Sequence, residues 1–474
     1  MTAKKKASAK KAEPETGLPA WVKLPLALIL IGAVIAIVGI LMGEKTHLAH
    51  AWLVSFMFYL SICLGGFFLV LLHYLLDTHW IVPIRRIAEH LACLLPLLAV
   101  FFVPIALFSG SEFVTISAGA KASEHEKNNN ALKADKKAAE VHGEKVEYKE
   151  GESDHAAHGP DSPRAFYSWM QSEKEYYASV PNETHDHAWR AKRGYLSTGF
   201  WHIRWVLCFV IWGVFTWLMR KHSLAQDSDG DAKWTGYNRK LAAAGIFVFA
   251  ATLTIGAIDW MKGLEHQWFS TMYGVYYFAG SVWVSLITIY VIALRLKTHG
   301  PLKDVVQKKT LKDNATLFFA FTVFYAYIHF SQYFLIWNAS IPEETFWYVK
   351  REQGPWWWVG MLIIFGHFFV PFLALLRQDV KVRSEVMITV AVLAWFIHFC
   401  DMSYNIMPLI HESSGWMELI WIDLGCLLLM GGCLSIAFIY FFKKHPPYPQ
   451  RDPRIAETMG VYVKLHSEAK VVGK

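Results

Sequence analysis

The densest group of residues able to do chemistry lies in the apolar stretch 385–407. His398, Asp401 and Asn405 follow one another at spacings of three and four, which places their side chains on one face of a helix. A charged side chain at the centre of a membrane costs about 2.5–3.5 kcal/mol even on lenient scales, so such groups need partners or water. An imidazole beside a carboxyl there suits proton transfer or contact with a polar headgroup. We predict that this stripe is functional; the alternative is a set of interhelical hydrogen bonds.

Two further histidines lie inside apolar stretches. His329 shares a stripe with Tyr325 and Gln332, and His367 stands near the middle of its own stretch, beside Gly366. Both side chains suit the same proton path, and both suit ordinary hydrogen bonding between helices. The sequence leaves these two interpretations open.

Other acids and histidines lie closer to the ends of their stretches. Asp259, His73 and Asp77 are examples, and polar side chains in such places can simply reach interfacial water. We nevertheless include them as candidates. The candidates for a proton path are His398, Asp401, Asn405, His329, His367, Asp423, Asp259, Glu265, His266, His73 and Asp77.

The sequence predicts no cofactor and no metal in this chain. Its cysteines form no CxxC pair and no haem c attachment pattern, which argues against an iron–sulfur cluster. Only His398 and His411 show the spacing of about thirteen residues that is typical of haem b ligands, and Pro408 intervenes. All six cysteines lie within apolar stretches: Cys63, Cys93, Cys208, Cys400, Cys426 and Cys433.

Uncharged or nearly uncharged blocks of about twenty residues carry these side chains. The chain of 474 residues is 54% hydrophobic, and blocks of this length can span about 30 Å of hydrocarbon. We predict an all-α, polytopic transmembrane protein of about ten helices. The first block is too long for the apolar core of a cleaved signal peptide, so we expect it to remain. The expected helices are 23–42, 51–75, 87–109, 200–219, 241–260, 272–294, 315–337, 356–376, 385–407 and 416–442.

Basic residues alternate between the two sides of these blocks. The two tails and the loops after even-numbered blocks are rich in Lys and Arg, whereas 408–415 has none and 261–271 has only Lys262. By the positive-inside rule both termini are cytoplasmic, and we expect a multi-pass protein of the bacterial inner membrane. These loops account for the net charge of +7, so no nucleic-acid partner is implied.

One long polar segment, 110–199, is expected outside the cytoplasm. Its first half, from Lys121 to Pro163, has almost no large apolar residues and is expected to be disordered. Its second half is aromatic and should pack on the membrane surface or a partner. The first half also holds four scattered histidines, which we expect to be solvated; metal binding is the alternative. They are His125, His142, His155 and His158. The expected divisions are tail 1–22, helices one to three 23–109, insertion 110–199, helices four and five 200–260, helices six to ten 261–442, and tail 443–474.

A weak internal duplication relates helices two to five with helices six to nine. The fourth helix of each unit holds an aspartate and then a histidine: Asp259 with His266, and Asp401 with His411. Four helices per unit make the two copies parallel. The sequence thus predicts two tandem four-helix bundles, with helices one and ten flanking them.

Three segments carry a resemblance to a known family. Residues 257–271, AIDWMKGLEHQWFST, resemble a motif of the integral-membrane subunits of bacterial alternative complex III, a quinol:electron-acceptor oxidoreductase. Residues 334–345 and 365–372 are similar to the second of its two large membrane subunits, which are of the polysulfide-reductase (NrfD) type. The resemblance runs from about residue 24 to 445 and leaves out the insertion and both tails.

The resemblance implies paired four-helix bundles and partners that hold the redox centres. Those partners would be a sister NrfD-like subunit, an iron–sulfur subunit and haem c subunits, with menaquinol or ubiquinol as the reductant. In this family a proton pathway or structural support is proposed for the second membrane subunit. The motif departs from the family pattern at Gly263 and at the order His266-Gln267, which leaves the role of His266 open.

We therefore expect a membrane subunit of a respiratory quinol:cytochrome c (or other acceptor) oxidoreductase. It would supply a proton pathway and support, without carrying redox catalysis by itself. One alternative is a quinol-binding subunit with its own site near His398 and Asp401. Another is a stand-alone secondary transporter, which the duplication suits, although no span is broken by Gly and Pro at matching places in the two halves.

Overall fold

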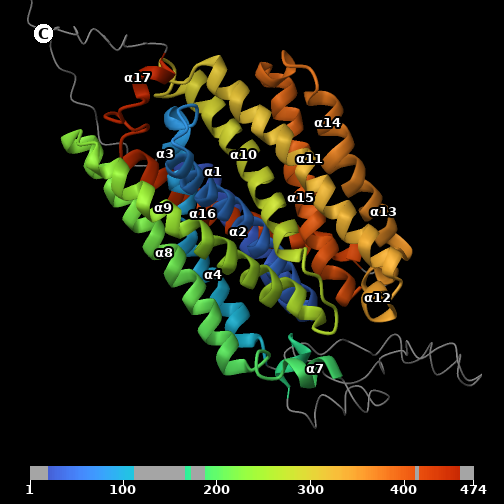
Figure 1. The fold of residues 1–474 in the computed structure, drawn as a ribbon. Helices are drawn as coiled ribbons and strands as arrows, with labels where there is room; N and C mark the ends of the chain where they lie inside the picture. Colours follow the sequence, from blue (N-terminus) through green and yellow to red (C-terminus); the bar gives the residue numbers. More distant parts are fainter. Residues whose placement is uncertain (1–19, 111–165, 172–186, 412–415, 460–474) are drawn as a thin grey trace, which may run out of the picture.

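A computed structural model describes residues 20–110, 166–171, 187–411 and 416–459. All regular structure in these ranges is helical, and ten of the helical segments are long and apolar enough to cross a membrane, which confirms the predicted class (Figure 1). The expectations for most of the N-terminal tail, for the C-terminal tail after residue 459 and for most of the insertion, including its four histidines, lie outside the described residues. The α-helices are α1 (Ala20–Leu41), α2 (Lys45–Leu76), α3 (Val82–Ala92), α4 (Leu95–Phe108), α7 (His187–Lys192), α8 (Thr198–Asp229), α9 (Lys233–Gly256), α10 (Tyr273–His299), α11 (Lys308–Ala339), α12 (Pro342–Arg351), α13 (Gly354–Ile363), α14 (Val370–Leu375), α15 (Ser384–Ile406), α16 (Trp416–Lys444) and α17 (Ile455–Thr458).

The long helices lie side by side in two groups of four. The first bundle holds α2, α3 with α4, α8 and α9, and the second holds α10, α11, α13 with α14, and α15. Helices α2 and α10 pack on one another where the bundles meet, and α1 lies along α16 as a flanking pair. The predicted duplication and its flanking helices are therefore present. We name the two ends of the molecule after the short helices there, the α7 end and the α17 end (Figure 1).

Helix α2 is buried along most of its length. It contacts α9, α10, α15 and α16, so little of its surface is left for lipid. Small residues allow the close approach to α10: a Cβ on Gly65 would overlap the backbone of Ser281 and the side chain of Ser285. Such small residues are typical of tightly packed membrane helices, because lipid offers no hydrophobic gain and contact has to supply the attraction.

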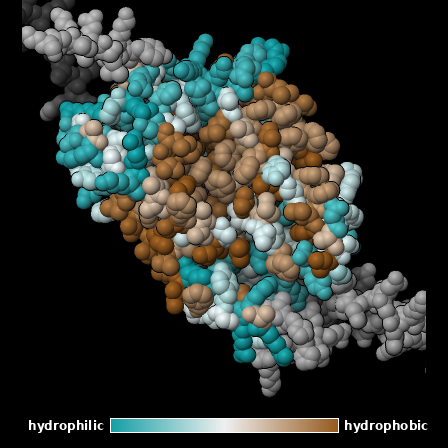
Figure 2. All heavy atoms as spheres, in the orientation of Figure 1, coloured by the Kyte–Doolittle hydropathy of each residue, from teal (hydrophilic) through white to brown (hydrophobic). Residues whose placement is uncertain are grey.

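The outer surface is apolar between two hydrophilic ends. Figure 2 shows a band of hydrophobic side chains across the middle of one face, with polar residues at both ends. Leu107, Trp217 and Phe247 are among the large apolar side chains exposed there. A band of this kind suits lipid, so the chain is a multi-pass membrane protein.

Two of the long helices depart from plain α-helix where polar residues sit. The π-helix η2 (Ala257–Met261) ends α9 and carries Asp259, and the π-helix η4 (Ile364–Phe369) joins α13 to α14 and carries His367. Such π segments widen the turn and often mark functional positions. The 3-10 helix η3 (Lys262–Glu265) follows η2, and η5 (Val380–Val382) lies between α14 and α15.

The third expected helix differs from the prediction. It was expected as one block, 87–109, with Arg85 and Arg86 in the preceding loop; instead α3 begins at Val82 and a break separates it from α4. Pro96 lies in the first turn of α4, where its missing N–H costs no helical hydrogen bond. Both arginines are therefore buried helical residues.

The described aromatic residues of the insertion pack on this chain itself. Tyr167 and Trp169, at the 3-10 helix η1 (Ser168–Met170), donate hydrogen bonds to the carbonyls of Trp260 (2.9 Å) and Gly263 (3.0 Å). Trp189 of α7 donates to the carbonyl of Trp169 at 3.3 Å. The insertion thus covers the turn η2–η3 at the α7 end.

Candidate functional site

The stripe on α15 faces the interior of the second bundle. His398, Asp401 and Asn405 are buried there, with exposed fractions of 4% or less. Helices α2, α10 and α13 and the π-helix η4 pack on α15. The chemistry of this site depends on which groups from those helices reach the carboxyl.

Neutral donors hold the Asp401 carboxyl. The Tyr276 hydroxyl donates to its Oδ1, and the Asn405 side chain donates to the Tyr276 hydroxyl at 2.9 Å and to the Asp401 carbonyl at 2.8 Å. The Tyr273 hydroxyl donates in turn to Oδ1 of Asn405 at 3.0 Å. Within the described ranges no lysine or arginine pairs with Asp401, and its Oδ2 accepts no hydrogen bond.

The Ser61 hydroxyl contacts the imidazole of His398. It donates to the Phe58 carbonyl at 2.6 Å and lies 2.8 Å from Nε2 of His398. With the Ser61 proton on that carbonyl, Nε2 carries the hydrogen and Nδ1 keeps a lone pair. That nitrogen has no hydrogen-bond partner in the described part of the chain and faces Oδ2 of Asp401 at 4.0 Å. A basic nitrogen and a free carboxyl oxygen thus face one another in a buried site.

His367 lies beside this pair, between two aromatic rings. Its ring centroid is 3.7 Å from that of Trp283 and 3.5 Å from that of Tyr325, with both pairs stacked. Its two nitrogens have no hydrogen-bond partner among the described residues. The π-helix brings it there, and Gly366 allows the close packing, because a Cβ at that position would overlap the Ile397 side chain.

A stripe on α11 completes the group. The Tyr325 hydroxyl donates to that of Tyr276 at 3.4 Å, and the His329 ring centroid lies 5.6 Å from that of Tyr276. Gln332 is nearer the α7 end, where it donates to the Tyr348 hydroxyl at 3.0 Å and accepts from Ser270 at 2.8 Å. The structure therefore brings the predicted α11 stripe and α15 stripe together.

A buried ion pair covers the α7 end of this group. Arg351 of α12 pairs with Glu265 at 2.8 Å and donates to the carbonyls of Tyr404 (2.9 Å) and Asn405 (3.0 Å). These carbonyls belong to the last turn of α15, which has no helical donors left for them. Arg351 therefore caps α15 and fixes the position of Asn405. We refer to the α11 and α15 stripes with Tyr273, Tyr276 and His367 as the second-bundle cluster.

Several predicted residues lie elsewhere. His266 is outside the cluster: its carbonyl accepts from Lys192 at 3.0 Å, and its ring lies 3.5 Å from the Ser168 hydroxyl. Asp423 on α16 lies 3.3 Å from His47 of α2, whose other ring nitrogen is 2.8 Å from His411. This group is at the α7 end, next to the flanking pair.

Asp259 belongs to the first bundle and is fully partnered. Its Oδ2 accepts from Arg204 at 2.5 Å, and its Oδ1 accepts from the Tyr195 hydroxyl at 2.8 Å. The Arg204 guanidinium also lies over the Tyr195 ring, 3.9 Å from its centroid. The carboxylate here is held as an ion.

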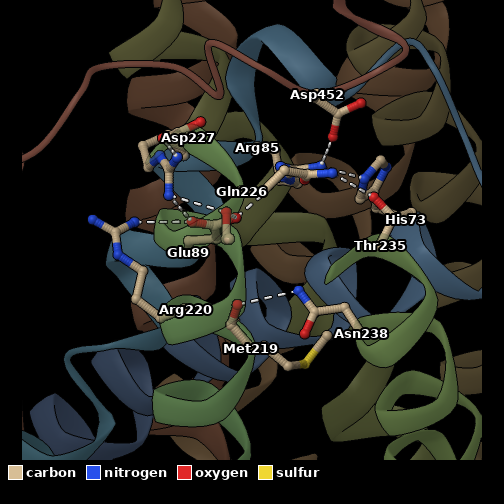
Figure 3. A network of polar contacts seen from close by, with 12 residues as sticks. His73, Arg85, Glu89, Met219, Arg220, Gln226, Asp227, Thr235, Asn238 and Asp452 are labelled. Atoms are coloured by element: carbon tan, nitrogen blue, oxygen red, sulfur yellow. Dashed lines mark hydrogen bonds and ion pairs between the residues drawn. The ribbon is translucent and has the colours of Figure 1, made fainter. Parts of the chain in front are cut away.

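His73 borders a charged network at the α17 end of the first bundle (Figure 3). Glu89 is its centre and pairs with Arg85 (3.1 Å), Arg86 (2.8 Å) and Arg220 (2.9 Å). His73 contributes Nε2, 2.7 Å from a guanidinium nitrogen of Arg85.

The C-terminal segment completes the charge balance of this network. Asp452 accepts from Arg85 at 2.5 Å, and the backbone N–H of Gln450 donates to Asp227, which itself pairs with Arg86. Arg454 pairs with Asp77. Burial disfavours the ionised form of Asp452, but the Arg85 guanidinium outweighs it and holds the pKa of that carboxyl below its usual value.

One set of side chains approaches the spacing of a metal site. Donor atoms of His367, His398 and Asp401 lie within 4.8 Å of one another. A tetrahedral ion with bonds of about 2.0–2.2 Å would hold such atoms about 3.4 Å apart, whereas Nδ1 of His398 and Oδ2 of Asp401 are 4.0 Å apart. These side chains would have to move together to hold an ion. The six cysteines are all free.

Sequence reasoning missed Tyr276, Ser61 and Glu89. Glu89 carried a usable signal, since it is an acid within a block that was expected to span the membrane. Tyr276 and Ser61 carried none, because tyrosine and serine are common in such helices. Both gain their meaning from partners more than 120 residues away in the chain.

Comparison with known proteins identifies no family for this chain. No protein-family model matches the sequence, and no curated protein matches it. Function is therefore inferred from the geometry of the second-bundle cluster and from the resemblance of the three sequence segments.

Proposed function

We propose that this chain is a membrane subunit of a respiratory quinol:acceptor oxidoreductase and that its second bundle conducts protons through Asp401. One observation carries the proton part. Oδ2 of Asp401 and the lone pair on Nδ1 of His398 face one another in a buried site, 4.0 Å apart, with no cation to hold the carboxyl ionised. A carboxyl without such a partner favours its protonated form when buried, and so can take up and release a proton.

The relay has three steps. A proton reaches Oδ1 of Asp401 along the hydroxyls of Tyr325 and Tyr276, each passing on its own hydrogen and receiving another. Rotation of the carboxyl turns the acidic hydrogen towards Nδ1 of His398. Transfer then leaves a carboxylate and an imidazolium, which attract one another until the proton moves on.

The packing around His398 leaves space for small movements, which a proton relay between Asp401 and His398 would require. A Cβ on Gly280 would lie 3.2 Å from the imidazole of His398, so this glycine leaves room beside the ring. His367 is stacked between two aromatic rings, which block rotation of its ring about the Cβ–Cγ bond. Small rotations are therefore the movements that the packing permits.

The respiratory part of the proposal rests on the resemblance of residues 257–271, 334–345 and 365–372. It supplies the partners: a sister NrfD-like subunit, an iron–sulfur subunit and haem c subunits. The basic loops support a bacterial inner membrane with both termini in the cytoplasm. A stand-alone transporter would purify without haem c subunits, so purification in mild detergent separates the two.

The test is Asp401→Asn, which keeps the shape and removes the titration. We expect the complex to assemble, while quinol-driven proton movement in proteoliposomes falls at least tenfold. Asp304→Asn is the matched control, since that acid is exposed at the α17 end. Asp401→Leu should instead impair assembly, because Tyr276 and Asn405 would lose a buried partner, at about 1–3 kcal/mol.

Two outcomes would refute separate parts of the proposal. Unchanged turnover and unchanged proton movement in Asp401→Asn would mean that the stripe only joins helices. Purification without haem c subunits would remove the respiratory context, while the proton part could still be measured with an imposed pH gradient. A quinone resolved beside His398 would favour the quinol-binding alternative.

A further inference from the structure

Lysines gather at the α17 end of the second bundle. Lys297 lies in the last turn of α10, Lys308 and Lys312 lie in the first turns of α11, and Lys381 lies in η5, which packs on α11. None of them forms an ion pair with a described residue. This group differs from the other end of the same bundle, where Arg351 and Lys350 face Glu265.

Lys381 is the informative member. Its side chain is covered, with 2% exposure, and its ammonium lies 4.7 Å above the centroid of the Phe319 ring. Its ammonium makes no hydrogen bond or ion pair within the described ranges, while its backbone carbonyl accepts from the Tyr290 hydroxyl at 3.0 Å. The nearest acid in the sequence, Asp379, is already engaged by Arg377 at 3.1 Å and by Arg383 at 2.9 Å.

Two effects disfavour the charged form of the Lys381 side chain. Burial and then the charge of Lys312 lower the pKa of Lys381 below its usual value. The ammonium lies near a like charge, and no described side chain supplies an anion beside it. An anion that pairs with Lys381 would therefore come from outside the chain.

The surface beside Lys381 is apolar. Phe319 stacks on Phe372 of α14 with a centroid distance of 5.4 Å. Leu373 of α14 and Leu376, directly after it, are more than half exposed. A ligand reaching the lysine from this side would meet a charge at the end of the bundle and hydrocarbon along α14. Those are the two parts of a phospholipid.

We propose that Lys381 and Lys312 bind the phosphate of an anionic phospholipid whose acyl chains lie along α14. Basic pockets at the ends of membrane helices hold such headgroups through charge and hydrogen bonds. The first bundle offers a contrast at the same end, because Glu89, Asp227 and Asp452 already neutralise its arginines. An outside anion is required only where the chain lacks its own.

The test measures lipid retained by the full complex in nanodiscs of phosphatidylcholine with or without phosphatidylglycerol. We expect the complex to retain phosphatidylglycerol preferentially on this subunit, as counted by native mass spectrometry. Lys381→Gln should weaken that retention about fivefold, the effect of one basic residue near an anionic lipid. Lys303→Gln, which removes an exposed lysine at the same end, is the control and should retain lipid like the unmodified chain.

Each remaining outcome decides the matter. Equal retention of the two lipids, or normal retention by Lys381→Gln, would overturn the proposal. Inorganic phosphate added to phosphatidylcholine discs could instead be retained on this subunit as strongly as phosphatidylglycerol. That result would assign the site to free phosphate and overturn the proposal of a lipid site. If Lys381→Gln fails to fold, the exposed Lys312→Gln provides the same measurement and should weaken retention.

Discussion

Asp259 and Asp401 occupy matching places in the two bundles and have opposite surroundings. Each lies near the α7 end of the fourth helix of its unit, and each is buried. Arg204 holds the first carboxyl at 2.5 Å, whereas Tyr276 and Asn405, both neutral, surround the second. A cation fixes an acid in its charged form, and neutral donors leave its protonation open. The duplicated fold thus presents the same group once as a structural ion and once as a titratable site.

The contrast extends along both bundles. Charged partners accompany the acids of the first bundle, from Arg204 near the α7 end to Arg85 at the α17 end. The second-bundle cluster consists of tyrosines, histidines, amides and one acid. The acids of the first bundle therefore have charged partners, and the proposed proton path lies in the second bundle, whose one clustered acid has neutral partners.

The largest expected effect separates the two aspartates by stability. Asp259→Asn leaves the Arg204 guanidinium buried without its counter-ion, and breaking such a pair costs about 3–5 kcal/mol. Asp401→Asn leaves no unpaired cation, so the loss should be below about 1 kcal/mol. Thermal unfolding of the two purified complexes measures the difference. Equal losses for the two variants would remove the distinction between them.

A double variant sharpens the same comparison. Replacing both members of a buried pair by neutral groups is often nearly neutral, whereas removing one is not. Asp259→Asn with Arg204→Met should therefore be more stable than Asp259→Asn alone, in the same unfolding measurement. A double variant as unstable as the single one would mean that Arg204 acts through its hydrogen bond to the Tyr195 carbonyl (2.8 Å) rather than through charge.

An intermediate effect concerns the C-terminal segment. Arg85 holds the pKa of Asp452 below its usual value, so the folded state binds this proton more weakly than the unfolded state does. The contribution of Asp452 to stability is then complete above its unfolded pKa of about 3.9 and is lost as the pH falls through the folded value.

Hydrogen exchange of residues 446–459 measures this contribution. Protection should be constant at neutral pH and fall below about pH 4, and Asp452→Asn should lower it at neutral pH by about 1–3 kcal/mol, since Arg85 loses a charged partner. Asp231→Asn, at an exposed acid on the same end, is the control. Protection that rises on acidification would contradict the assignment of Asp452 as an ion.

The smallest difference is expected between two tyrosine variants. Tyr276→Phe removes the hydroxyl that donates to Asp401 and accepts from Asn405, and should destabilise by about 1–3 kcal/mol. Tyr195→Phe also removes a donor to an aspartate, but Asp259 keeps Arg204, and the loss should stay near 0.5–1.5 kcal/mol. A larger loss for Tyr195→Phe would mean that both acids depend on hydroxyls alike.

The sequence predicted what repeats along one helix. Blocks of twenty apolar residues gave the ten spans, and spacings of three and four put His398, Asp401 and Asn405 on one face. Neither inference needs to know what the facing helix carries. The sequence did not predict that His367 lies beside this stripe, because a π-helix sets the direction of its side chain.

The sequence could not predict which charges meet. Arg85, Arg86 and Arg220 were assigned to basic loops because they flank apolar blocks, and that interpretation was wrong in detail: they are buried in α3 and α8 around Glu89. Ion pairs between distant segments leave no periodic pattern. Arg204 and Asp259 are 55 residues apart, and Arg85 and Asp452 are 367 apart.

The burial of α2 has a consequence for how the chain is made. This helix leaves the ribosome early, yet Ser61 finds its partner His398 only 337 residues later. At ribosomal speeds of about 5–20 residues per second, α2 waits about 20–70 seconds for that partner. Until then its polar side chains have to be sheltered by the insertion machinery or by α1. The cluster around Asp401 consequently forms only when nearly the whole chain exists, so the proposed proton path would be incomplete in an unfinished subunit.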